Sequence, residues 1–145
     1  MKRFSQATAK EMRSLIRKNK WDKLTAGLAM GYAQANLVIL PGKYAFDFLL
    51  FCQRNPKPCP LIEVLESGRY RTEFLASDAD VRTDIPKYNI YRKGKLEKTV
   101  KEIKRLWRDD FVTFLLGCSF SFEEALLRAK IPVRHIEENK NVPMY

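Results

Sequence analysis

The stretch ANLVILPGKYAFDFLLFCQR, residues 35–54, decides the fold class. Its first part, Ala35 to Leu40, is an apolar run that ends at Pro41, which is typical of a buried strand. The part that follows, Lys43 to Arg54, is apolar on nearly all sides and predicts a helix packed against several neighbours. A strand followed directly by such a helix predicts an α/β fold.

Before this stretch, the chain begins with a predicted helix over residues 8–19. Thr8 and Glu11 have the spacing of a capping box, and apolar side chains then recur at helical spacing. A loop over residues 25–32 follows, in which Gly27 and Gly31 interrupt regular structure.

After the stretch, the proline-rich segment 55–60 predicts a rigid connector and a domain boundary. A strand is expected over 61–65, and a hairpin over 88–91 and 96–100. We therefore predict a main α/β domain formed by residues 1–56 and 105–145. A smaller β-rich subdomain is expected to be inserted over 57–104.

The last third of the chain predicts helices from about residue 102 onward. Asp109 and Asp110 stand where carboxylates favour a helix start, the run 111–116 is apolar, and Gly117 ends it. Ser121 and Glu124 repeat the capping-box spacing and predict a second, shorter helix that reaches about residue 129.

Composition narrows the class of protein. The 145 residues include 46% hydrophobic and 30% charged residues, and no apolar run approaches the roughly 20 residues of a membrane-spanning helix. Three cysteines without CxxC spacing indicate a reducing compartment, so we expect a cytoplasmic protein. The net charge of +10 is spread along the chain without a nucleic-acid-binding motif, so nucleic acid is not the expected partner.

Four long strings carry a resemblance to a known family. They are TAGLAMGYAQANLVILP from Thr25, AFDFLLFCQRNPKPCPL from Ala45, LWRDDFVTFLLGCSFSFEEALL from Leu106 and IPVRHIEENKNVPMY from Ile131. With them, the chain resembles the amino-terminal half of the YcsI-type hydro-lyases, the family that includes D-glutamate cyclase.

The resemblance implies a two-part α/β fold and lyase chemistry, namely cyclisation of D-glutamate to 5-oxo-D-proline with loss of water. Members of the family continue well beyond the motif at 141–145. We therefore expect part of the α/β core, and part of the active site, to be missing from this chain.

Cyclisation needs groups that move protons and groups that hold a carboxylate. Arg134, His135 and Glu137 offer a carboxylate fork, a titrating base or acid and a second carboxylate, and are the first choice for such a site. Two other roles remain open. A lone histidine is more often a hydrogen-bonded structural residue, and Arg134 and Glu137 could form a surface ion pair.

The loop from Gly117 to Ser121 is the second choice. It precedes a predicted helix, where free backbone amides could hold a carboxylate, with Ser119 and Ser121 beside them. Capping alone would also explain Ser121. Cys118 is a candidate nucleophile only if its pKa is lowered, and a buried inert cysteine is the more common case.

Further candidates for contact with the substrate are spread along the sequence. Four more polar side chains could contact a carboxylate substrate, although each also has a structural explanation: Gln34, Asn36, Arg54 and Arg82.

No cofactor is required by this chemistry. A zinc site built from the cysteines is discounted because of their spacing, whereas a divalent ion at Asp109, Asp110 or Glu137 stays open. The expected partner is a small carboxylate, and a homo-oligomer is left open. The rival hypotheses to an active enzyme are a noncatalytic module that binds a small acid and a truncated, inactive member of the family.

Overall fold

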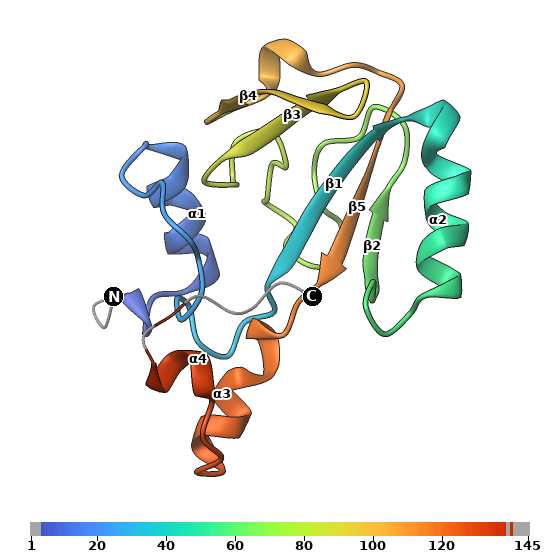
Figure 1. The fold of residues 1–145 in the computed structure, drawn as a ribbon. Coiled ribbons are helices and arrows are strands. Elements are labelled where there is room, and N and C mark those ends of the chain that lie inside the picture. The colour runs from blue at the N-terminus through green and yellow to red at the C-terminus, as the bar shows by residue number, and fades with distance from the viewer. Residues whose placement is uncertain (1–3, 139, 141–145) are drawn as a thin grey trace.

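The computed structural model describes residues 4–138 and Lys140, and the motif at 141–145 lies outside the described residues. Its main sheet is antiparallel, with strand order β1-β5-β2 (Figure 1). These strands are β1 (Ala35–Pro41), β5 (Phe111–Gly117) and β2 (Leu61–Leu65). Helices and strands both contribute to the fold, which confirms the predicted α/β class.

The central strand β5 corrects the prediction of a helix over residues 111–116. Thr113 and Phe114 point to opposite faces of the sheet and are 0% and 1% exposed, so both faces of β5 are buried. A strand buried on both faces has no alternation of polar and apolar residues, and its sequence cannot be distinguished from a buried helix by periodicity. Asp109 and Asp110 accordingly lie in the turn that precedes β5 and not at a helix start.

Helix α2 (Ala45–Arg54) follows β1 after a short 3-10 helix, η2 (Gly42–Tyr44), as the sequence predicts. It packs on the sheet through Phe48, whose ring lies edge-on to that of Phe114 with the centroids 4.9 Å apart. The expectation that α2 packs on several sides is wrong for the described residues, because Phe46 is 72% exposed and Phe51 is 51% exposed.

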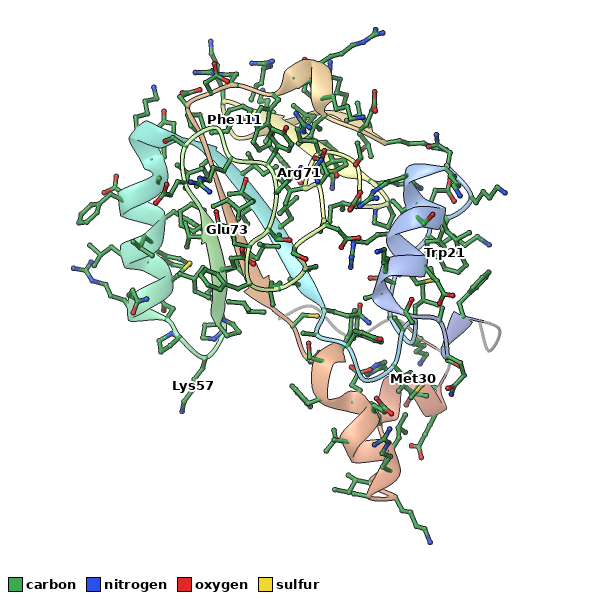
Figure 2. All side chains as sticks on the ribbon, turned by 180° about the vertical axis from the view of Figure 1, so that it is seen from behind. Trp21, Met30, Lys57, Arg71, Glu73 and Phe111 are labelled. Atoms are coloured by element: carbon green, nitrogen blue, oxygen red, sulfur yellow. The ribbon has the colours of Figure 1, made fainter. Side chains whose placement is uncertain are left out.

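The opposite face of the sheet is covered by the long loop 66–87, which Figure 2 shows from behind with Arg71 and Glu73 labelled on it. Glu63 of β2 holds this loop. Its buried carboxylate accepts hydrogen bonds from the backbone N–H groups of Glu73, Phe74 and Leu75, at 2.6, 3.2 and 3.0 Å. These charge-assisted bonds satisfy loop donors that would otherwise be buried without partners.

A separate two-stranded sheet is the predicted hairpin, β3 (Tyr88–Arg92) and β4 (Lys95–Val100). Lys93 and Gly94 form its turn with φ of +49° and +75°, the backbone shape that a two-residue hairpin turn requires. A 3-10 helix, η3 (Lys104–Leu106), follows the hairpin. Strand β2 lies in the main sheet although its residues fall within the predicted insertion 57–104, and the division into domains stays a prediction.

Helix α1 (Ala9–Arg17) begins with the predicted capping box, in which Thr8 and Glu11 bond each other's backbone N–H groups. On one side of α1, Met12 packs against Leu28. Leu28 belongs to the loop over residues 25–32, which we call the glycine loop. On the other side of α1, basic residues reach the loop 66–87, where Arg17 pairs with the buried carboxylate of Asp84. The first helix is thus fixed to two loops.

Helices α3 (Phe120–Arg128) and α4 (Arg134–Glu137) lie together at the end of the sheet where β5 finishes (Figure 1). Among the described residues, no helix has both the length and the apolar character needed to cross a membrane.

Candidate functional site

Gln34, immediately before β1, joins the glycine loop to the start of α3. Its side-chain amide donates to the backbone carbonyls of Thr25 and Leu28, at 3.2 and 3.3 Å, and its amide oxygen accepts from the Thr25 hydroxyl. Its backbone N–H donates to the Ser121 hydroxyl at 2.9 Å. Gln34 and Ser121, predicted independently as ligand residues, therefore meet, but each is already engaged in holding the other.

The lone histidine faces a buried acid. His135 of α4 lies with Nε2 3.3 Å from Oε1 of Glu123 on α3, and the two side chains are only 16% and 10% exposed. A carboxylate at this distance favours one orientation of the imidazole ring. This is the arrangement that a proton-transferring histidine needs.

Glu123 also lines a small pocket between α3, α4 and the glycine loop. The pocket has a volume of about 40 Å³, close to the roughly 30 Å³ that one water molecule occupies in the liquid. Gln34, Phe120 and Ile136 contribute to its walls. Such a space accommodates a single functional group of a ligand and not a whole amino acid.

Gly31 of the glycine loop lies close to α3 in a backbone conformation that favours glycine. Its φ is +86°, and a Cβ there would lie 3.2 Å from the carboxylate of Glu124. Any substitution would combine backbone strain with a contact that pushes Glu124 away. The pocket wall therefore depends on glycine at this position.

Cys118 lies beside the same junction, with its thiol 3.6 Å from the backbone carbonyl of Gln34. Burial raises the pKa of the Cys118 thiol, and the negative charge of Glu123 adds to the rise. A raised pKa keeps the thiol protonated at neutral pH, which disfavours the role of nucleophile.

The start of α3 corrects two further expectations. Ser121 does not cap the helix with Glu124, because Ser119 is the N-cap residue and makes no capping bond, whereas the Ser121 hydroxyl bonds Gln34. The backbone N–H groups of Ser121 and Phe122 donate to the carbonyls of Cys118 and Ser119. These two amides are therefore not free to hold a substrate carboxylate.

Arg134 and Glu137, the other two residues of the first-choice site, are exposed on α4. The Arg134 side chain is 89% exposed and pairs with Glu138 one turn later, at 2.9 Å. Glu137 is exposed on the surface of α4. Of the three predicted neighbours, only His135 faces Glu123, which lines the pocket, because consecutive residues on a helix face different directions.

The other predicted ligand residues lie outside this region. Asn36 is exposed on β1 opposite Leu116, and Arg54 is exposed at the last position of α2. Arg82 pairs with Asp80 through two hydrogen bonds, and its guanidinium lies 3.3 Å from the ring centroid of Tyr70. Arg82 therefore has a structural role within the loop 66–87.

A larger hollow lies on that loop. It has a volume of about 490 Å³, is open to solvent and contains none of the predicted site residues. Its lining includes Arg69, Arg71, Thr72 and Ser77. Among residues 4–138 and Lys140, no three His, Cys, Asp or Glu side chains gather closely enough to hold a metal ion.

Sequence reasoning missed Glu123 as the partner of His135. Glu123 lies in the first turn of α3, between Phe122 and Glu124, where a carboxylate is adequately explained by the helix dipole. The only available signal was indirect, since a lone histidine that transfers protons generally has a carboxylate or carbonyl partner.

Comparisons with known proteins point to one family. A family model described as D-glutamate cyclase matches residues 112–145, which include Glu123 and His135. A protein of Thermoanaerobacter sp. (strain X514) named "Putative hydro-lyase" is 62% identical over 135 residues, or 93% of this chain and 51% of that protein.

Two further relatives are each 58% identical to this chain. One from Geobacillus kaustophilus, with the same name, is 58% identical over 95% of this chain and 52% of its own. "Putative hydro-lyase YcsI" of Bacillus subtilis is 58% identical over 94% of this chain and 53% of its own. The chain spans about half the length of the curated relatives it matches.

Proposed function

The chain belongs to the YcsI-type hydro-lyase family, which includes D-glutamate cyclase, and from this premise we propose that it carries part of a hydro-lyase site for a small amino-acid carboxylate. The observation that supports the proposal most is the contact between Glu123 and His135. It lies at a pocket, is shielded from water and falls within the segment that the family model matches.

The substrate we propose is D-glutamate. Its amine, after loss of a proton from the ammonium, attacks the side-chain carboxyl carbon and forms the ring C–N bond. The side-chain carboxylate has already taken up one proton, so its hydroxyl leaves with a second proton as water when the C–O bond breaks. The ring nitrogen gives up its own second proton to become the amide N–H, so the two protons lost by nitrogen equal the two gained by oxygen. The product is 5-oxo-D-proline, and the reaction consumes no oxidant, reductant or phosphate donor.

His135 is suited to move both protons. As a neutral imidazole it accepts the proton from the ammonium, and as an imidazolium it returns a proton to the departing hydroxyl. The Glu123 carboxylate, 3.3 Å away, stabilises the imidazolium between these steps and keeps the ring in one orientation. Glu123 thus acts on the reaction through His135, as a positioning residue.

The substrate must lie over the mouth of the pocket, because a space of about 40 Å³ is too small to enclose it. Arg134, on the same short helix as His135, is the predicted cation for the substrate carboxylate and would have to leave Glu138 to bind. The rest of the substrate would contact the half of the family protein that this chain does not span. We propose a cytoplasmic enzyme that needs no cofactor.

The experiment is a product assay on a joined protein, in which this chain is followed by the unmatched half of the Geobacillus kaustophilus relative. It is incubated with D-glutamate or L-glutamate, and 5-oxoproline is followed by mass spectrometry. Activity with D-glutamate that falls about 100-fold or more in His135→Ala and in Glu123→Gln would support the proposal. The matched control is Glu97→Gln, an exposed carboxylate of the hairpin, which should leave the rate unchanged.

Two results would count against the proposal. Absence of 5-oxoproline from either enantiomer would exclude glutamate cyclisation, and full activity in His135→Ala would exclude the proposed site. A rate that persists in the 145-residue chain alone would contradict the need for the second half.

A noncatalytic small-acid binder is the second candidate, and the hollow on the loop 66–87 favours it. Arg71 lies there exposed, with its guanidinium 5.9 Å from the Tyr70 ring, beside the hydroxyl-bearing Thr72 and Ser77. Titration of the 145-residue chain with D-glutamate by calorimetry tests this role. Saturable binding lost in Arg71→Ala, without turnover in any form of the protein, would favour the binder over the enzyme.

A further inference from the structure

Strand β2 exposes an apolar side chain on the face opposite to that of Glu63 and Leu65. Val64 is 38% exposed, whereas its neighbours Glu63 and Leu65, which point to the other face, are 5% and 2% exposed. A strand that alternates in this way normally has polar residues on its exposed face. Here the exposed face is the apolar one.

The exposed face of β2 is the face on which α2 lies. Val64 pairs with Phe114 across the strands, and paired residues point to the same face of a sheet. Phe114 contacts Phe48 of α2, so Val64 lies on the α2 side as well. Figure 1 shows α2 running alongside β2.

Helix α2 adds two aromatic side chains to this region. Phe46 is 72% exposed and Phe51 is 51% exposed, and the Phe51 ring is stacked near that of Phe48 at 6.2 Å. We define the α2–β2 surface as Phe46, Phe51 and Val64. Phenylalanine is among the side chains most enriched at the buried centre of protein interfaces.

The outer edge of β2 is also unpaired within the described residues. Strand β2 pairs with β5 on one side, and no other described strand pairs with it. Natural proteins generally protect such an edge with charges, prolines or a covering segment, because its free N–H and C=O groups promote association. Next to an apolar surface, an open edge marks a place where another segment adds to the sheet.

The relatives indicate what that segment is. About half of each one's length, as in the Geobacillus kaustophilus protein, lies outside its match to this chain. We infer that the α2–β2 surface is the docking surface for that unmatched half, which covers Phe46 and Phe51 and extends the sheet at β2. The inference concerns assembly alone, so it stands or fails independently of the proposed function.

The charges around the surface specify the partner further. Lys43 and Arg54 flank α2, Asp47 lies in its first turn, and Lys57 projects from the connector between α2 and β2 (Figure 2). The covering segment should therefore be apolar at its centre and acidic at its border.

Hydrogen exchange tests the inference directly. Amide exchange is compared between the 145-residue chain and the joined protein that also carries the unmatched half of the Geobacillus kaustophilus relative. We expect exchange in α2 and β2 to slow by about 10-fold or more, and exchange in the β3–β4 hairpin to change by less than about 2-fold. The intact relative provides a second measurement that does not depend on folding of the joined protein. Unchanged exchange over residues 45–65 in the joined protein and over the aligned segment in the relative would overturn the inference.

Matched substitutions locate the contact. The unmatched half is supplied as a separate polypeptide, and its affinity is measured by calorimetry for Phe46→Ser/Phe51→Ser and for Phe74→Ser. Phe74 is 86% exposed on the loop 66–87, on the other side of the sheet, and serves as the control. The double variant should bind at least about 10-fold more weakly and the control unchanged.

Three outcomes would overturn the inference: no binding of the separate half to the unsubstituted chain, equal weakening by both variants, or a dimer of the 145-residue chain that Phe46→Ser/Phe51→Ser dissociates. The last outcome would make a second copy of the chain the occupant of the surface.

Discussion

The two faces of β2 differ in how completely the chain covers them. On one face Glu63 and Leu65 are almost fully buried beneath the loop 66–87, whereas on the other face Val64 remains more than a third exposed beside α2. A helix covers only the strip of sheet that lies under its axis, whereas a loop can follow the sheet to its edge. The comparison shows that an irregular segment can cover a sheet more completely than a regular one.

The loop succeeds because carboxylates satisfy its backbone. Glu63 accepts three N–H groups, and Asp80 accepts the backbone N–H of Arg82 while its own N–H donates to Asp84. A buried loop without such partners would leave polar groups unsatisfied at a cost of about 1–3 kcal/mol each. The face under the loop is therefore held together by hydrogen bonds, and the face under α2 by apolar contacts.

The largest expected effect tests the apolar contacts. Phe114 is 1% exposed in the central strand and touches Phe48, so Phe114→Ala should lower the free energy of unfolding by about 4 kcal/mol through lost burial and a cavity. Urea unfolding followed by circular dichroism measures the change. A loss below about 1 kcal/mol would mean that α2 contributes little to the folded state.

The next effect tests the hydrogen bonds of the loop face. Glu63→Gln keeps the size of the side chain but removes its charge and one acceptor, and should lower the free energy of unfolding by about 2 kcal/mol. Glu97→Gln removes an exposed carboxylate that pairs with Arg92 and should cost less than about 0.5 kcal/mol. Equal effects of the two substitutions would contradict a special role for Glu63.

Asp80 makes the stability of the loop depend on pH. Burial opposes ionisation of Asp80, but hydrogen bonds from Arg82 and nearby positive charge outweigh burial and hold the pKa of Asp80 below its usual range. A carboxylate with a lowered folded pKa stabilises the protein above its unfolded pKa of about 3.9, and that contribution is lost as the pH falls through the folded value.

Asp80→Asn should therefore cost about 1.5 kcal/mol at pH 7, and the difference from the unsubstituted chain should shrink below about pH 4. Urea unfolding at several pH values measures this difference. The control is Asp22→Asn, whose exposed carboxylate lies 3.8 Å from Lys101. A difference that stays constant down to pH 3 would rule out the ionised carboxylate as its source.

Short sequence patterns correctly predicted the elements that depend only on a few neighbouring residues. The capping box at Thr8, the strand before Pro41 and the turn at Gly94 each depend on a few neighbouring residues, and the structure confirms all three. Strand β5 was misread as a helix because its identity depends on burial between two layers that its own sequence does not encode. Exposure of α2 was missed for a related reason, since an apolar sequence does not reveal which residues cover it.

The candidate site was predicted only in part. The sequence identified His135 because it is the sole histidine, and Gln34, Cys118 and Ser121 because they flank predicted elements, and the structure brings these four close to one junction. Glu123 comes from a different helix, and only tertiary packing sets it against His135. The family itself was identified from long strings of sequence, which need no knowledge of the fold.

The smallest expected effect sharpens the comparison most. Phe46→Ala removes the same side chain as Phe114→Ala from the same face, but Phe46 is 72% exposed, so the free energy of unfolding of the 145-residue chain should change by less than about 0.5 kcal/mol. In the joined protein, where we infer that Phe46 is covered, the same substitution should cost about 2 kcal/mol or more. Urea unfolding of both proteins measures the two values. If Phe46→Ala were neutral in both, α2 would remain uncovered in the longer protein, and the difference between the two faces would be a lasting property of the fold.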